Sequence, residues 1–536
     1  MKRKTISLAV CSFLVAGLFS GCATSSLTTS KDDLEKLKTA QYPIETDVEL
    51  SLFHWQGGSG WDQIKAEDGA KRIIDLLEEK TGIKVKRIYP PVGQEEQQFN
   101  IMLASGEYPD IIGWKWGEFV GGADKAVRDG YIVNLNELID EYSPNFKKML
   151  ENDPYIDKMV KTDEGNYCYY PGLTEHGEGK DNLLLTSGYV FRKDWLDELE
   201  LPVPETIDDW HQTLTAFKEK KGAISPLCMT AMDAKEGLAG AFGINLGFYK
   251  DDAGKIQYGF VQPAFKDFVT MMNQWYSEGL IDKNIADIDS KTVDSRLLND
   301  ETGAVFAWLG GGMGKWLTAA KGLGMEKFNL VGVPAPVINK GDRAKYAARE
   351  LPVATAGHAI SATSEHKELA IKFLDYGYSE EGHMVYNFGE EGVTYEMIDG
   401  FPTYTPFMTN NPNGKSFDDQ LSIYTHALGK GPYIMDNRYI TQRYFWAQQK
   451  EAQKNWGNND VVDYQLPVLT PSEADSKEFA NIMNNINTYT SEMYLKFIVG
   501  TKPISEFDSF VQQIRDYGID RAIKIQQDAL DRFNNR

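Results

Sequence analysis

The sequence has few of the residues and motifs that most enzymes need. Its 536 residues include only 4 cysteines and 7 histidines, and it contains neither a GxSxG nor an HExxH motif. The segment 310–315 is glycine-rich, but Leu309 and Trp316 stand where a phosphate-binding P-loop needs glycine and serine or threonine. No Asp-x-Asp-x-Asn-Gly calcium loop occurs. We therefore expect no enzymatic activity, no cofactor and no metal.

Positive charge is also scarce. The chain has 56 basic and 78 acidic residues, a net charge of −22, which opposes binding to nucleic acid or to an anionic lipid surface. A hydrophobic fraction of 42% and an aromatic fraction of 12% are typical of a globular protein. The length favours two or more lobes, each with its own core.

The uncharged N-terminal stretch 6–19 is short for a membrane span. It follows Lys2, Arg3 and Lys4 and precedes "SGC", so residues 1–21 are predicted to be a lipoprotein signal peptide, with Cys22 as the lipidated residue. An ordinary secreted protein is the alternative. Residues 22–46 are predicted to be a polar tether, which gives a lipid-anchored protein on the extracellular face of the cell membrane.

Two cysteines lie in the folded part of the sequence. Cys168 and Cys228 are each surrounded by apolar residues and form no CxxC motif. An exported protein can pair them as a disulfide, but two buried free thiols fit the sequence equally well.

Alternating strand and helix patterns predict an α/β architecture with a mainly parallel sheet. A strand near 47–54 precedes an apolar stripe at Ala70, Ile73, Ile74 and Leu77, which predicts a helix that Gly82 ends. Similar units recur along the chain. A hairpin is predicted to turn at 252–254, and residues 470–533 are predicted to be helical.

Several tryptophans stand where predicted strands end in glycine-rich loops. In α/β sheets, ligands bind beyond the carboxyl ends of the strands, and sugar rings stack on aromatic side chains beside a few oriented polar groups. Core packing is the alternative for each tryptophan, and it is the favoured one for Trp195, Trp210 and Trp275, which lie in helical patterns. The candidate sugar-binding residues are Trp55, Gln56, Trp114, Trp116, Glu118, Trp308, Gly310, Gly311 and Trp316.

Several phrases together resemble the large carbohydrate-binding lipoproteins of Gram-positive ABC importers. They include "IMLASGEYPDII", "VFRKDWLDELELPVPETIDDW", "WYSEGLIDKNIAD" and "FLDYGYSEEGHMVYNFGEEGVTYE", and the resemblance runs from about residue 47 to the C-terminus. It implies a two-lobed periplasmic-binding-protein-like fold of type II, similar to maltose-binding proteins, with a ligand cleft between the lobes and a hinge of several chain crossings. The implied lobes are 47–175 with 340–388, and 176–339 with 389–536.

The same resemblance implies the position of the sugar site. It maps the first glycine-rich loop onto Trp55, Gln56 and Trp61, and the loop after "PDII" onto Trp114, Trp116 and Glu118. It adds Phe191 and Arg192 from the strand "YVFRKD", and Gly310, Gly311, Met313 and Trp316 from the turn after "GAVFAW". Some relatives that bind acidic oligosaccharides carry a calcium loop where this chain reads "KKGAISPLCMT", so bound calcium is not expected here.

The resemblance implies a monomeric receptor that captures an oligosaccharide by lobe closure and delivers it to membrane permease subunits. A receptor for a peptide or another small solute on the same fold is one alternative. A surface hydrolase acting on glycans is the other.

Overall fold

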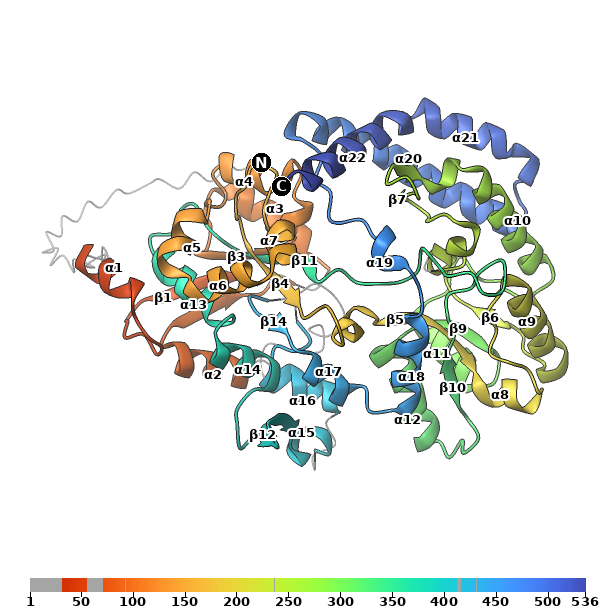
Figure 1. The fold of residues 1–536 in the computed structure, drawn as a ribbon, viewed down its shortest axis with the longest axis horizontal. Helices are drawn as coiled ribbons and strands as arrows, with labels where there is room; N and C mark the ends of the chain where they lie inside the picture. Colours follow the sequence, from red (N-terminus) through yellow and green to blue (C-terminus); the bar gives the residue numbers. More distant parts are fainter. Residues whose placement is uncertain (1–30, 55–70, 92, 236, 412–415, 430) are drawn as a thin grey trace, which may run out of the picture.

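The protein folds into two α/β lobes that lie side by side (Figure 1). The computed structural model describes residues 31–54, 71–91, 93–235, 237–411, 416–429 and 431–536. Each lobe contains its own sheet, and the chain passes between the lobes several times (Figure 1). The predicted two-lobed α/β fold is confirmed.

The sheet of the first lobe has the strand order β14–β4–β11–β3–β1–β2. Strand β1 pairs in parallel with β2 and β3, and β4 pairs in parallel with β14, whereas β11 is antiparallel to both β3 and β4. The strands are β1 (Glu49–Phe53), β2 (Lys84–Ile88), β3 (Ile111–Trp114), β4 (Tyr170–Thr174), β11 (Val353–Ile360) and β14 (Ile434–Met435).

The sheet of the second lobe has the order β10–β5–β9–β6. Its strands are β5 (Ser187–Arg192), β6 (Leu227–Cys228), β9 (Ala304–Trp308) and β10 (Leu330–Gly332). Strand β5 is antiparallel to both of its neighbours, and β6 is parallel to β9. Among the described strands of each sheet, only one runs opposite to the others, β11 in the first and β5 in the second, so the predicted mainly parallel direction is confirmed for the remaining strands. Strands β5 and β11 enter their lobes from the hinge, so they run opposite to the strands that end there.

Helices cover both faces of the first sheet. In α2 (Lys71–Thr81), Ile73 and Leu77 of the predicted stripe are buried and Ile74 is half-buried, whereas Ala70 lies outside the described residues. Leu76 is buried as well, and Gly82 follows with a left-handed φ of 74°. The other helices of this lobe are α3 (Glu95–Ser105), α4 (Gly122–Arg128), α5 (Asn136–Tyr142), α6 (Pro144–Asn152), α7 (Pro154–Val160), α13 (Lys367–Tyr376) and α14 (Glu380–Phe388).

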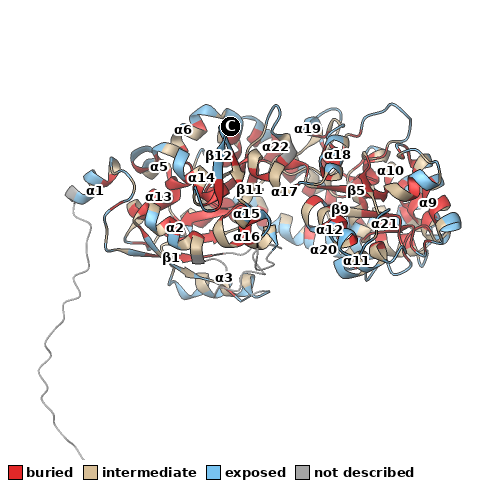
Figure 2. Cartoon of the chain, turned by 90° about the horizontal axis from the view of Figure 1, so that it is seen from below, coloured by how far each residue is buried: buried red, intermediate tan, exposed pale blue. Residues whose placement is uncertain are grey.

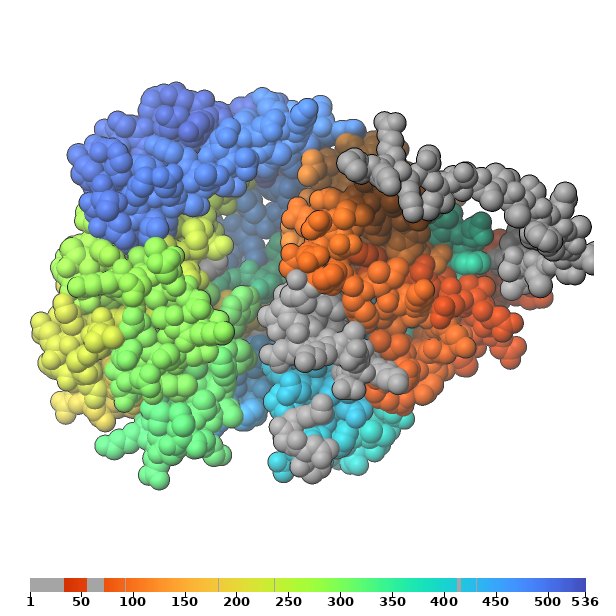
Figure 3. All heavy atoms as spheres, turned by 180° about the vertical axis from the view of Figure 1, so that it is seen from behind, coloured from red at the N-terminus to blue at the C-terminus, as the bar shows by residue number. Residues whose placement is uncertain are grey.

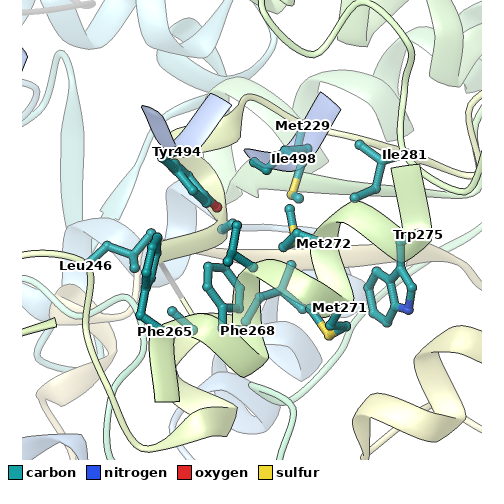
Figure 4. Packing of buried hydrophobic residues seen from close by; sticks show 14 of the residues in the cluster. Met229, Leu246, Phe265, Phe268, Met271, Met272, Trp275, Ile281, Tyr494 and Ile498 are labelled. Atoms are coloured by element: carbon teal, nitrogen blue, oxygen red, sulfur yellow. The ribbon is translucent and has the colours of Figure 1, made fainter. Parts of the chain in front are cut away.

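The second lobe has a large aromatic core where α10 packs against α20 (Figure 4). Figure 4 shows Phe265 and Phe268 of α10 beside Tyr494 of α20, with ring centroids 5.9 Å and 6.1 Å from that of Tyr494. A Thr206–Asp209 capping box begins α9, and Gly500 ends α20 in the left-handed conformation. The helices are α8 (Lys193–Glu198), α9 (Ile207–Lys221), α10 (Pro263–Ser277), α11 (Ser290–Leu298), α12 (Lys315–Gly322), α18 (Ala447–Trp456), α20 (Glu473–Val499) and α21 (Phe507–Asp516).

Two hairpins complete the lobes. Strands β7 (Phe248–Lys250) and β8 (Ile256–Tyr258) form the predicted hairpin around Gly254, which has a φ of 73°. Strands β12 (Tyr395–Ile398) and β13 (Phe401–Tyr404) form another, followed by α15 (Pro406–Thr409) and α16 (Phe417–Tyr424).

The segment after residue 388 contacts both lobes, whereas the prediction assigned it to the second lobe alone. Helix α16 packs beside α2, and β14 pairs with β4 of the first sheet. Residues of the second lobe such as Val305 and Trp316 also share a core with Tyr395, Tyr404, Met408 and Leu421 of this segment, which therefore lies between the lobes.

The predicted tether is shorter than expected. Helix α1 (Lys31–Lys38) and the following turn pack on the first lobe, where Leu37 and Ile44 are buried. The Tyr42 hydroxyl donates to the Lys372 carbonyl at 2.6 Å, and its ring meets Tyr376 edge-on. The polar composition of 22–46 hid these few apolar contacts. Residues 22–30 lie outside the described part of the chain.

Buried residues concentrate around both sheets and exposed ones on the outer helical faces (Figure 2). Cys168 and Cys228 are free and buried, and burial raises the pKa of each thiol. Within the described ranges, we find no helix with the length and apolar composition needed to cross a membrane.

Helix α18 packs directly on the backbone of the second sheet. The Trp456 ring covers Gly188, and its indole N–H donates to the Tyr189 carbonyl at 3.2 Å. A Cβ at Gly332 would lie 2.3 Å from the Cβ of Ala452. Glycine is required at these positions because no space remains for a side chain.

We expect Gly332→Val to lower the free energy of unfolding by about 3 kcal/mol, because the added carbons must displace α18 from the sheet. Urea denaturation would measure the loss. Gly322→Ala in α12 is the control, since a Cβ there meets nothing within 4 Å, and we expect it to change stability by less than about 0.5 kcal/mol. Equal stability of Gly332→Val and the parent protein would contradict this account of the packing.

Candidate functional site

The ends of two central strands lie on the sides of the lobes that face the hinge. Strand β3 ends at Trp114, which pairs with Gly357 near the start of β11. Strand β9 ends at Trp308, which pairs with Ser187, the first residue of β5 after the crossing. From behind, the molecule is hollowed between the orange first lobe and the green second lobe (Figure 3). This interlobe cleft is the candidate site.

The loop after β3 divides its two tryptophans between different environments. Trp114 is half-buried and stacks on Phe99 of α3, with ring centroids 3.9 Å apart. Trp116 opens the short 3-10 turn Trp116–Glu118, is fully buried, and donates its indole N–H to the Ile112 carbonyl at 3.0 Å. The turn thus directs the Trp116 ring into the core, and its predicted contact with a ligand stays a prediction. Glu118 is exposed and accepts a 2.7 Å hydrogen bond from Thr355.

The loop after β9 forms a π-helical turn, Leu309–Gly314, that leads into α12. Trp308 is 55% exposed, and a Cβ at Gly311 would meet nothing within 4 Å. Gly310 lies against Arg443, whose guanidinium would be 3.0 Å from a Cβ there. These residues leave the accessible surface that a planar ligand needs.

Two predicted residues of the same turn are core residues instead. Met313 is fully buried, and Trp316 is 3% exposed with its indole N–H donated to Asp294 at 2.7 Å. The turn rotates both side chains beneath the strand, where they pack with Ala307 and Leu317. Their predicted contact with a ligand is not supported.

Phe191 and Arg192 of β5 are also buried. Phe191 meets the Trp210 ring edge-on at 4.8 Å. Arg192 pairs with Asp194 at 2.6 Å and Asp300 at 2.5 Å. Burial alone would lower the pKa of Arg192, but the two carboxylates raise it above its usual value. Both faces of β5 are covered, so neither residue is available to a ligand.

Sequence reasoning missed an exposed aromatic pair near the π-helical turn. Phe445 is 61% exposed and lies 5.4 Å from the half-buried Trp446, measured between ring centroids. Gln449 joins this segment to the turn by donating to the Leu309 carbonyl at 2.6 Å. The signal was the aromatic run "YFW" at 444–446, which precedes α18.

Trp55, Gln56, Trp61 and the predicted lipidation site Cys22 lie outside the described residues. Among the described residues, no group of three or more histidine, cysteine or carboxylate side chains could hold a metal ion. The segment 222–226, which joins α9 to β6, contains no carboxylate. The site therefore consists of aromatic rings, glycines and single polar groups.

The protein-family description "bacterial extracellular solute-binding protein" matches residues 55–384. The chain belongs to this family. The match covers more than half of the sequence and spans both lobes.

Curated relatives of this solute-binding protein align over most of its length. The fructooligosaccharide ABC transporter substrate-binding protein of Streptococcus pneumoniae is 23% identical, over 99% of each chain. The polygalacturonan/rhamnogalacturonan-binding protein of Bacillus subtilis is 25% identical, over 86% of this chain and 88% of its own. Lipoprotein LipO of Bacillus subtilis is 24% identical, over 82% of both. These relatives are binding proteins or lipoproteins by name.

Solved structures agree on the fold. An alginate-binding protein crystallised without calcium superposes with a TM-score of 0.72 at 22% identity, over 92% of this chain and all of that one. The Streptococcus pneumoniae substrate-binding protein in complex with kestose gives 0.70 at 20% identity, over 91% of this chain and all of that one. At these identities the likeness shows the two-lobed architecture.

The hinge of this solute-binding protein is a set of crossings bonded to one another. Thr174 donates its backbone N–H to Pro352 at 2.8 Å, and Glu350 donates to Leu184 at 2.9 Å. The Glu175 carboxylate accepts the backbone N–H of Asn437 at 2.8 Å, where α17 (Asn437–Arg443) begins. The crossings therefore form one connected layer between the lobes.

Helix α22 (Ile519–Asn534) also joins the lobes. Its first half packs in the core of the second lobe through Ile519 and Ala522, whereas Phe533 is buried in the core of the first lobe. Asp163 of the first lobe accepts from Arg532 at 2.6 Å and from Arg536 at 2.7 Å. The domain assignment of 389–536 to the second lobe is thus also incomplete at this helix.

We expect Asp163→Asn to loosen the end of α22, because one carboxylate holds two arginines there. Hydrogen exchange of peptides covering 530–536 should accelerate roughly tenfold, the local effect of losing about 1–2 kcal/mol. The effect should shrink at high salt, since the pairs are partly exposed.

Asp528→Asn is the matched control for Asp163→Asn. Among the residues that the structure describes, Asp528 pairs only with Lys524 of the same helix, at 2.7 Å, so the control removes a charge from α22 without touching the first lobe. Faster exchange at 530–536 in both variants would show that Asp163 has no special role.

Proposed function

We propose that this protein is the substrate-binding lipoprotein of an ABC importer, which captures an oligosaccharide outside the cell and delivers it to the membrane permease. Family membership supports the binding of a solute. The relatives named for fructooligosaccharide, for polygalacturonan and rhamnogalacturonan, and for melibiose, raffinose and stachyose support a saccharide. Lipidation at Cys22, a monomeric state and the absence of catalysis are parts of the same proposal.

The exposed indole of Trp308 is the observation that carries the proposal. It stands at a strand end on the cleft side of the second lobe, while Trp114 and Glu118 stand at the corresponding strand end of the first. Flat apolar rings beside single hydrogen-bonding groups suit sugar rings, which offer C–H faces and hydroxyl edges. Because the residues come from different lobes, a bound sugar would favour the closed state through contacts to both.

The proposal is tested by calorimetry against a panel of neutral and acidic oligosaccharides, with peptides as the competing class. Binding to at least one oligosaccharide is expected. Binding of peptides alone would overturn the saccharide assignment. The glycan recovered from the protein should be chemically unchanged, and its hydrolysis would instead indicate a surface hydrolase.

We expect Trp308→Ala to weaken oligosaccharide binding about thirtyfold, which corresponds to about 2 kcal/mol for losing a stacking ring. Phe445→Ala should weaken binding less than Trp308→Ala does. Its effect should be larger for long oligosaccharides than for short ones, because Phe445 lies beyond the π-helical turn. Leu323→Ala, at a 68% exposed residue after α12, is the control and should leave the dissociation constant unchanged. If Trp308→Ala bound oligosaccharides with wild-type affinity, Trp308 would not contribute to the binding site.

A further inference from the structure

Three of the seven histidines gather at the cleft-side end of the first sheet. His54 follows β1, His358 lies in β11, and Gly113 of β3 lies between them in the sheet. The imidazole centroids of His54 and His358 are 6.2 Å apart. A Cβ at Gly113 would lie 3.3 Å from Nε2 of His358, so this glycine lets the two rings share one layer.

His426 and two tyrosines complete the layer. The His426 ring stacks on Tyr386 of α14 with centroids 5.2 Å apart, and Tyr89, just after β2, meets His54 edge-on at 5.4 Å. His54, His358 and His426 each keep between 6% and 9% of their surface exposed. A small part of each residue therefore remains accessible to solvent.

Arg87 of β2 brings the positive charge. It is partly buried and pairs with Leu52 in the parallel register of β1 and β2, which places it on the same face of the sheet as His54, two residues after Leu52. Its charge lowers the pKa of all three histidines. Within the described chain, its only hydrogen bond is a 3.4 Å contact from Nη1 to the Val85 carbonyl. Other arginines of this lobe have carboxylate partners, such as Arg72 with Glu79 and Glu390. Burial lowers the pKa of Arg87, yet a guanidinium stays protonated.

The histidines are neutral at pH 7. Burial, followed by the charge of Arg87, lowers the pKa of His358 to about 4, and burial likewise lowers that of His426 to about 3. Burial, followed by the neighbouring histidines, lowers the pKa of His54 well below its usual value. Nδ1 of His358 is buried and has no hydrogen-bond partner among the described residues. The layer thus offers the fixed positive charge of Arg87 beside neutral imidazoles, and no carboxylate of the described residues pairs with this guanidinium.

We infer that Arg87, together with His54, His358 and His426, forms a subsite for the carboxylate of an acidic oligosaccharide. A guanidinium that has no carboxylate partner among the described residues can bind a ligand carboxylate through two parallel N–H···O bonds, and the low dielectric strengthens this pairing. One positive charge matches one carboxylate, whereas a dianionic phosphate would retain uncompensated charge. Because the protein carries a net charge of −22, an anionic ligand needs a local positive charge such as that of Arg87 to bind. This inference rests on the proposed function, and it specifies the sugar as one containing uronic acid.

The test compares each uronic-acid oligosaccharide with its carboxyl-reduced neutral counterpart of the same linkage and length. Tri- and tetrasaccharides of galacturonic, glucuronic and mannuronic acid would be titrated into the protein by calorimetry. At least one acidic member should bind tighter than its neutral counterpart. Arg87→Gln should weaken the acidic ligand at least about 30-fold and change the affinity for the neutral one by less than about threefold.

Lys86→Gln is the matched control. Lys86 is the preceding residue of β2, is exposed, and points to the opposite face of the sheet. The same charge change there should leave both affinities unaltered. An equal loss of affinity for the acidic ligand in Arg87→Gln and Lys86→Gln would show that only the net charge of the protein matters, and it would contradict the subsite. Circular dichroism and thermal melting would establish that Arg87→Gln is folded.

The two proposals fail in different ways. Tighter binding of neutral than of acidic oligosaccharides in every pair would overturn the carboxylate subsite and leave the oligosaccharide receptor intact. An absence of binding to any saccharide, neutral or acidic, would overturn the receptor proposal and the subsite with it.

Discussion

The hydrogen bonds between the chain segments that cross the hinge are the interaction on which the architecture depends. Thr174 with Pro352, Leu184 with Glu350, and Glu175 with Asn437 join crossings that are far apart in sequence. Because the crossings are bonded side by side, the lobes can rotate about this layer but cannot slide independently. The antiparallel directions of β5 and β11 follow from it, since each strand enters its lobe from the hinge.

Local patterns were sufficient for much of the fold. The stripe of α2, the hairpin around Gly254 and the helical C-terminal region depend on periodicity and turn chemistry, which neighbouring residues encode. The lobe boundaries depend on distant contacts instead. Nothing near residue 434 indicates that a two-residue strand pairs with β4, and nothing near residue 533 indicates which core receives Phe533.

The candidate site divides in the same way. Strand ends with glycine were identifiable in the sequence, and Trp308 is exposed at one of them. The direction of each following side chain was not, because a 3-10 turn buries Trp116 and a π-helical turn buries Met313 and Trp316. Phe191 and Arg192 lie on a strand that is covered on both faces. The alternation of polar and apolar residues along such a strand therefore does not indicate which side chains face solvent. Phe445 and the histidine layer combine segments that only tertiary structure brings together.

The contrast between Trp308 and the other indoles has an optical consequence. Trp308 is the one largely exposed tryptophan among the described residues, while Trp116, Trp210, Trp275, Trp316 and Trp456 are buried. An aqueous collisional quencher such as iodide therefore has preferential access to Trp308. The buried rings supply a constant emission background, so the part of the quenchable fluorescence that Trp308 contributes reports whether the cleft surface around this residue is covered.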